Sequence, residues 1–209
     1  MEALIGVVVT VLIIAVTVWF GIVQQRKAAA NLRAGAERLG LKFTPSAGIG
    51  KEGPRADGVI RGREARFWCY EAGSGKHRKC WVAVALSTTT QGRLLLNLQP
   101  QGFNTKVAEL FGAREIELGD ARFDAMWFVR ASDATAGRAA LTPELREKLN
   151  AARDGGARGN FSAEKAVVRY VQEGGFHRAG TFERLEGVIP LLEELAVATE
   201  VSESALSPS

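Results

Sequence analysis

The sequence predicts an α+β protein in which one N-terminal transmembrane helix is followed by a mainly antiparallel sheet domain with interspersed helices. Residues 3–23 form a nearly unbroken apolar run. The segments after residue 58 first alternate with period two and later show capped helical spacing. No strand–helix–strand repeat accompanies them, which argues against a parallel doubly wound sheet.

The apolar run is long enough to cross a bilayer. Its 21 residues would form a helix of about 31 Å, close to the hydrocarbon thickness of a membrane. Trp19 and Phe20 lie near one end, where membrane proteins place aromatic side chains. A cleaved signal peptide is the alternative, but no Lys or Arg precedes the run, and the run is too long. We therefore expect residues 3–23 to contact the lipid bilayer.

Charges next to the span predict its orientation. The residues that follow it are mostly basic: Arg26, Lys27, Arg33, Glu37, Arg38 and Lys42. Because positive charge stays on the cytoplasmic side, we expect an outside N-terminus and a cytoplasmic C-terminal domain at a bacterial inner membrane. Cys69 and Cys80 would then be reduced thiols.

Beyond the anchor at 1–23, we expect a juxtamembrane helix at 24–40, a cytosolic α+β domain at 41–199 and a disordered tail at 200–209. The juxtamembrane helix has an apolar face made of Ala28, Leu32, Ala36 and Leu39. Gly40 is its expected end. Residues 44–58 contain two prolines and several glycines, which predicts a loop.

Strands are predicted next, with a turn at 62–64 between the first two. Their expected ranges are 59–60, 65–70, 79–87, 93–98, 114–118 and 125–130, with a late hairpin at 161–171. If the loop around Gly73 and Gly75 is symmetric, Cys69 pairs with Cys80 and Trp68 with Trp81. A phosphate-loop interpretation of this loop fails, because the motif would need Gly at Tyr70 and Ser or Thr at His77.

Helices are predicted from cap signals. A short helix is expected at 106–111, and Asp133 is positioned to cap another that reaches Ala140. Thr142 and Pro143 open a helix that the Gly155–Gly156 pair ends. Thr181 is the expected cap of the final helix, which has an apolar stripe and a kink at Pro190.

Composition narrows the class of protein. Hydrophobic residues make up 46% of the 209 residues, and the net charge is +4. These two values exclude a disordered chain and a multi-pass membrane protein. Two cysteines exclude a disulfide-rich scaffold. The charge divides into a basic collar after the span, a modestly basic domain and an acidic final segment.

Basic residues gather at one predicted hairpin tip. Lys76, Arg78 and Lys79 flank His77 there. We interpret these three as a possible contact for anionic lipid headgroups or an acidic partner, with a solvated loop as the alternative. No nucleic-acid-binding module accompanies them, so nucleic acid is not an expected partner.

Catalytic and metal-binding patterns are not evident. The chain has no Gly-x-Ser-x-Gly elbow, and its two histidines and two cysteines lack a recognisable ligand spacing. We therefore predict no catalytic residue, no cofactor and no metal. The aromatic residues of the domain are expected in its core, with an aromatic ligand pocket as the alternative.

One stretch has a distinctive order of residues. A Phe123–Asp124 pair precedes Trp127-Phe128-Val129, and then come Asp133 and Leu141-Thr142-Pro143. This order resembles a pattern in bacterial membrane-anchored proteins of unknown function, whose members often have more than one span. The resemblance implies a fold and a membrane setting, with Phe123 and Phe128 packing and Asp133 capping, and it transfers no catalytic residue.

These observations favour a non-enzymatic interaction or scaffold module at the cytoplasmic face of the membrane, with a possible protein partner. Two alternatives stay open: a membrane-proximal enzyme of unknown chemistry, and a domain that binds anionic lipid headgroups.

Overall fold

The computed structural model describes residues 2–46, 53–73, 75–101 and 113–206. Within these residues the strands form one nine-stranded sheet in the order β1-β2-β3-β4-β9-β8-β5-β7-β6, and every neighbouring pair is antiparallel. The strands are β1 (Lys42–Thr44), β2 (Arg55–Ile60), β3 (Arg63–Ala72), β4 (Lys79–Ser87), β5 (Leu96–Pro100), β6 (Arg114–Glu115), β7 (Trp127–Ala131), β8 (Asn160–Glu164) and β9 (Val167–Glu173).

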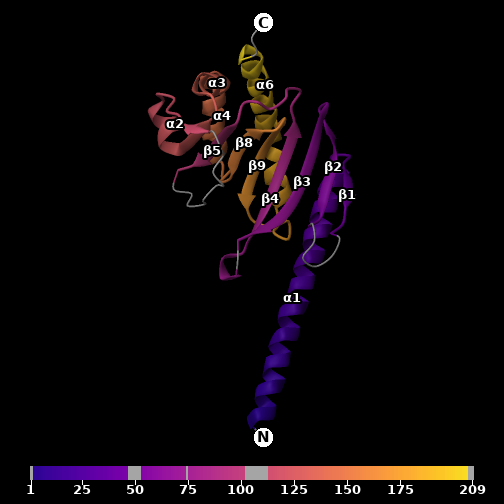
Figure 1. Ribbon diagram of the computed structural model, residues 1–209. Helices are drawn as coiled ribbons and strands as arrows, with labels where there is room; N and C mark the ends of the chain where they lie inside the picture. Colours follow the sequence, from indigo (N-terminus) through magenta and orange to yellow (C-terminus); the bar gives the residue numbers. More distant parts are fainter. Residues whose placement is uncertain (1, 47–52, 74, 102–112, 207–209) are drawn as a thin grey trace.

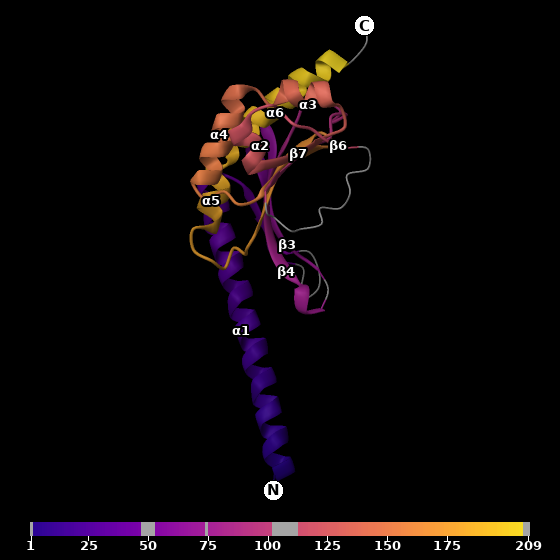
Figure 2. The same ribbon diagram turned by 90° about the vertical axis from the view of Figure 1, so that its left-hand side faces the viewer.

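Helices cover one face of this sheet, as the edge-on view in Figure 2 shows for α1, α4, α5 and α6. The helices are α1 (Glu2–Arg38), α2 (Ala121–Met126), α3 (Ala134–Ala140), α4 (Pro143–Asp154), α5 (Thr181–Gly187) and α6 (Ile189–Leu206). A single 3₁₀ turn, η1 (Gly75–His77), lies between β3 and β4. The expected fold class, a long apolar N-terminal helix followed by an antiparallel α+β domain, is confirmed.

The core lies between the sheet and these helices. Successive strand residues point to opposite faces, so Phe67 and its cross-strand neighbour Val84 share the helix-covered side and are fully buried. The Phe67 ring stacks on Phe182 of α5, with ring centroids 4.8 Å apart. Trp127 and Phe161 extend the same aromatic layer toward β8. This layer packs α5 onto the sheet.

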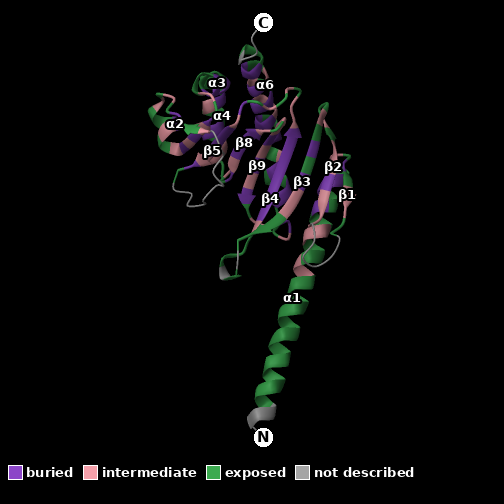
Figure 3. Cartoon of the chain, viewed as in Figure 1, coloured by how far each residue is buried: buried purple, intermediate pink, exposed green. Residues whose placement is uncertain are grey.

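Helix α1 is continuous from the expected span into the domain (Figure 1). Residues 5–22 are exposed, and Figure 3 shows this part of the helix in green. Leu32 and Ala36, by contrast, are completely buried. Asn31 Nδ2 donates to the carbonyl oxygen of Phe176 over 2.7 Å. At Gly40, φ is +67°, and the amide of Leu41 bonds back to the Ala36 carbonyl, which ends the helix as expected. The helix is therefore part of the domain core as well as the candidate anchor.

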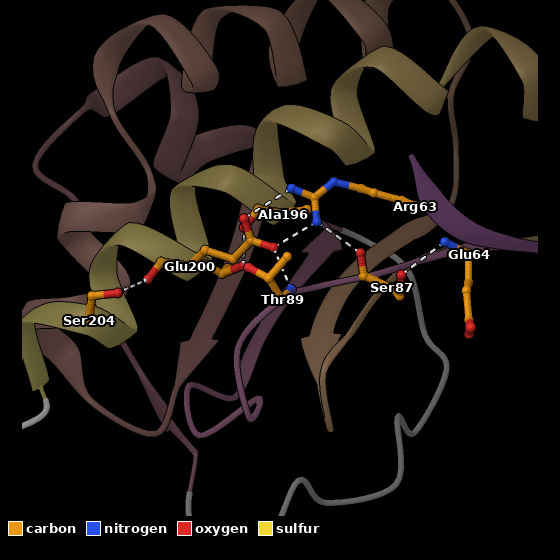
Figure 4. Close-up of polar contacts among 8 residues, drawn as sticks. Arg63, Glu64, Ser87, Thr89, Ala196, Glu200 and Ser204 are labelled. Atoms are coloured by element: carbon orange, nitrogen blue, oxygen red, sulfur yellow. Dashed lines mark hydrogen bonds and ion pairs between the residues drawn. The ribbon is translucent and has the colours of Figure 1, made fainter. Parts of the chain in front are cut away.

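Helix α6 is joined to the sheet through the half-buried carboxylate of Glu200. The Arg63 guanidinium donates to both oxygens of Glu200 over 2.6 and 3.0 Å, and to the carbonyl oxygen of Ser87 (Figure 4). The amide of Thr89 donates to the same carboxylate over 2.7 Å. The guanidinium and the Thr89 amide hold the pKa of Glu200 at about 2. The network connects the start of β3 and the segment after β4 to the last turns of α6.

The last turns of α6 contradict the disordered tail that was expected to begin at residue 200. Residues 200–206 are helical, with Ser202 and Glu203 buried, and Glu203 accepts a hydrogen bond from the amide of Leu94. A polar sequence therefore stays folded because its carboxylates accept hydrogen bonds from backbone amides of the β4–β5 connection. Pro190 was expected to kink one helix. The chain instead breaks at Val188, and Pro190 is the second residue of α6, where its missing N–H costs nothing.

The β3–β4 register also differs from the expectation. Cys69 pairs with Val82 and Tyr70 with Trp81, and the ladder closes at Ala72 and Lys79. The predicted Cys69–Cys80 and Trp68–Trp81 pairs are wrong, because η1 shifts the centre of the connection by one residue. Pairing moves by two residues, so each side chain keeps its expected face.

Other boundaries differ where short elements lie at the sheet edges. The predicted loop at 44–58 contains the whole first half of β2, which pairs with β1, and the β2–β3 turn is at Arg61 and Gly62, both at positive φ. The strand expected at 125–130 begins only at Trp127, because α2 precedes it. Thr181 is not a cap, since Gly180 holds that position at φ +72°. The helix expected at 106–111 lies outside the described residues.

Candidate functional site

One end of the domain surrounds the emerging half of α1. We call it the anchor end, made of residues 21–30 of α1, the β3–β4 hairpin end at 71–80 and the segment 173–180. The hairpin projects from the same end of the sheet from which α1 leaves (Figure 1). Val18, Ile22, Arg78 and His177 line one common hollow, so these segments face the same open volume.

The three predicted contact residues lie together on this hairpin. Lys76 is in η1, and Arg78 and Lys79 follow it at the start of β4. Arg78 pairs with Glu71 over 3.1 Å and Lys79 pairs with Glu173 over 2.7 Å. Both basic side chains remain more than half exposed, and exposed ion pairs of this kind contribute only about 0–1 kcal/mol. Their charges therefore stay available to another anion.

Positive charge dominates the whole anchor end. Its charged residues are Arg26, Lys27, Glu71, Lys76, Arg78, Lys79, Glu173 and Arg178. Desolvation, with Arg178 and Lys27 nearby, lowers the pKa of His177 from its usual value, which favours the neutral imidazole. The end thus presents an excess of cations and a neutral hydrogen-bonding imidazole where α1 leaves the domain.

The opposite face of the sheet, which no helix of the described residues covers, has a different set of side chains. Three cross-strand rows run over β3, β4 and β9 on this face, and the pairing places them side by side. The rows are Arg66–Ala85–Arg169, Trp68–Ala83–Val171 and Tyr70–Trp81–Glu173. On β4 the rows contain the buried residues Ala85, Ala83 and Trp81, and more exposed side chains stand on the flanking strands.

We call Arg66, Trp68, Tyr70, Trp81 and Arg169 the open-face patch. Tyr70 is 40% exposed, Trp68 is half-buried and Trp81 is buried. Arg66 pairs with Asp57, and Arg169 pairs with Glu164 over 2.9 Å, so the charges are locally balanced. From the sequence both tryptophans are expected in the core: Trp81 is buried as expected, whereas Trp68 is only half-buried, and the patch as a surface was not predicted. Alternation in β3 and β4 indicated the face, but the β4–β9 pairing brings in Arg169 and has no local signal.

A large hollow connects these two regions. It has a volume of about 1640 Å³ and reaches from the exit turns of α1, past Cys69 and Cys80, to open-face residues such as Trp68 and Tyr70. Drug-sized ligands usually occupy about 300–1,000 Å³. The hollow therefore suits a ligand that is larger than a drug-sized molecule, or a protein segment.

The cysteines at its wall are poor nucleophiles. Both thiols are free and half-buried. Burial raises the pKa of Cys69 to about 12 and also raises that of Cys80. Among the described residues, no group of three or more His, Cys, Asp or Glu side chains is placed to hold a metal ion.

The residues of the sequence pattern at 119–145 have folding roles. Asp124 accepts from the amides of Leu118 and Asp120 over 3.1 Å each. Asp133 caps α3 through the amide of Ala136, and Thr142 caps α4 as expected. Phe123 is fully buried, whereas Phe128 is half-buried under the guanidinium of Arg130. These contacts organise the far edge of the sheet and bring no reactive groups together.

Fold and surface together fit a membrane-anchored α+β module. Within the described residues, α1 is the helix that is long and apolar enough to cross a membrane. No family model matches the chain, and no curated protein matches it in sequence. Among solved structures, it is similar to the crystal structure of the mycobacterial trehalose monomycolate transport factor A, TtfA. The TM-score is 0.62 at 11% identity, over 84% of this chain and 96% of that one, which shows a shared fold.

Proposed function

We propose that this protein is a single-pass, non-enzymatic interaction module at the cytoplasmic face of a bacterial inner membrane. In this proposal the domain binds a partner protein through the open-face patch. The observation that carries it is the position of that patch, on a sheet face that no helix of the described residues covers (Figure 2), in a domain whose own core helix continues into the apolar segment.

The composition of the patch supports binding. Tyr, Trp and Arg are enriched at protein interfaces, because they bury large areas and still offer hydrogen bonds. On this face five residues of these three types lie in neighbouring cross-strand rows, together with Ala83, Ala85, Val171 and Glu173. TtfA is named as a transport factor, and a role of that kind fits a protein that acts by binding. The enzyme alternative needs converging reactive groups, which the hollow's protonated thiols and paired charges do not supply.

Orientation is part of the proposal. The basic collar after the span favours a cytoplasmic domain, and the cationic anchor end would then face the anionic inner leaflet. Lys76, Arg78 and Lys79 would approach the headgroups, each contributing about 1 kcal/mol near an anionic surface. Such contacts would fix the orientation of the open-face patch relative to the membrane.

The partner can be sought with a photocrosslinking amino acid at Tyr70 in the full-length protein, expressed in the cells that produce it. We expect a discrete adduct of higher mass, because Tyr70 is an exposed member of the patch. The control position is Glu147, an exposed residue on α4. Arg66→Glu, which reverses a charge in the patch, should weaken the Tyr70 adduct severalfold. Equal labelling from both positions, or no adduct from Tyr70, would contradict the proposal.

A further inference from the structure

The membrane-facing part of the hollow is bounded by two kinds of surface. Val18, Gly21 and Ile22 line it from the apolar segment of α1, and Ala28 and Ala29 continue the same wall into the domain. Ile22 is 42% exposed, which leaves apolar surface uncovered at this level. The hollow thus begins beside side chains that would lie in the bilayer, and it extends beyond the end of the expected span.

Hydrogen-bond donors line the same hollow. Gln24, Gln25, Arg78 and His177 line the hollow at the anchor end. Gln25 and Arg78 are exposed, and the exposed Arg78–Glu71 pair is easily exchanged for another anion. Lys27 and Arg178 influence the same imidazole. An apolar wall that continues from the membrane and ends at cationic and neutral donors is complementary to a lipid.

We propose that this part of the hollow holds one bilayer phospholipid with an anionic headgroup. An acyl chain lies against Ile22, Ala28 and Ala29, and the headgroup phosphate meets Arg78, with Gln25 and His177 as further donors. Two observations favour this occupant over a peptide. The wall of the hollow continues the apolar half of α1, and the anchor end is positively charged. The inference rests on the proposed placement of the domain at the anionic leaflet, and it does not depend on a protein partner.

The test uses the full-length protein in phosphatidylcholine nanodiscs that contain phosphatidylglycerol with a photoactivatable group in its acyl chain. Adducts are mapped by mass spectrometry. We expect adducts on the hollow wall, including Cys69 or Cys80, in addition to those on the span. The same label on phosphatidylcholine should give severalfold fewer wall adducts. Arg78→Glu should remove this preference for the anionic lipid.

Two matched substitutions separate a site from general lipid contact. Ala29→Trp places a ring in the hollow, whereas Ala30→Trp adds the same ring at the neighbouring exposed position that does not line it. Ala29→Trp should lower the wall adducts severalfold, and Ala30→Trp should leave them unchanged. If Ala29→Trp fails to fold, Gln25→Trp, at an exposed wall position, replaces it.

Adducts confined to residues 5–23, or equal wall adducts in the two variants, would overturn the lipid site. A surviving Tyr70 adduct in cells would show that the protein-binding proposal stands without it. Loss of the Tyr70 adduct with intact wall labelling would show that the lipid site stands without the protein-binding proposal.

Discussion

Replacing Gly35 with leucine should detach α1 from the domain and lower the free energy of unfolding by about 3 kcal/mol, the upper end for overpacking a filled core. Any Cβ at this position would overlap the ring of Phe182. That ring cannot retreat, because it is 2% exposed, stacks on Phe67 and packs against Phe176. Glycine is therefore the residue that lets the helix backbone lie directly on α5.

The measurement is chemical denaturation of the full-length protein in a mild detergent, followed by tryptophan fluorescence. Ala34→Leu is the matched control, since it adds a larger side chain at the adjacent, exposed position of the same helix. It should change the stability by no more than about 0.5 kcal/mol. A Gly35→Leu protein as stable as this control would show that α1 is not a part of the core.

Glu200→Gln should cost about 2–3 kcal/mol at neutral pH, because it leaves the Arg63 guanidinium largely buried without its counter-ion. The Glu200 pKa is lowered from 4.5 to about 2 in the folded protein. A lowered pKa stabilises the fold fully above the unfolded value, and this contribution is lost as the pH falls toward the folded value. The stability difference between wild type and variant should therefore be largest above about pH 4.5 and shrink toward about pH 2.

Denaturation at a series of pH values between neutral and acid measures this difference directly. Glu37→Gln is the control, because Glu37 forms an exposed pair with Arg33 on the surface of α1. That variant should stay close to wild type at every pH. A Glu200→Gln protein with wild-type stability at neutral pH would mean that the carboxylate does not hold α6 to the sheet.

Local patterns predicted the parts of this fold that depend on local chemistry. The apolar run and the spacing of Ala28, Leu32, Ala36 and Leu39 identified α1 and its buried face, which the structure confirms. Asp133 and Thr142 cap the helices that they were expected to cap, since a cap needs only its own side chain and the amide three residues on.

Expectations failed where distant residues decide the structure. From the sequence, the last turns of α6 were expected to form a polar, disordered tail. Glu200 and Glu203 instead accept hydrogen bonds from amides more than a hundred residues away in sequence. The hairpin register depends on η1, whose presence no symmetric loop predicts. Only part of the candidate site could be predicted from the sequence. The basic residues of the hairpin are close together in sequence, whereas the open-face patch forms only because β9 pairs with β4.

The arrangement gives α1 two roles that follow from one continuous helix. Its first half offers apolar side chains to a membrane, and its second half buries Leu32 and Ala36 in the domain. No loop separates the two halves, so the direction of the helix sets which surfaces approach the membrane. The lipid and protein proposals both depend on that geometry and on a cytoplasmic domain.

Protease accessibility of a tag fused after Ser209 tests this placement most directly. The tagged full-length protein is compared in intact spheroplasts and in inverted membrane vesicles, with a periplasmic and a cytoplasmic marker protein in each. We predict that the membrane fraction retains the protein, and that protease removes the tag only in the inverted vesicles. Removal of the tag in intact spheroplasts would place the domain outside, and it would contradict the proposed module.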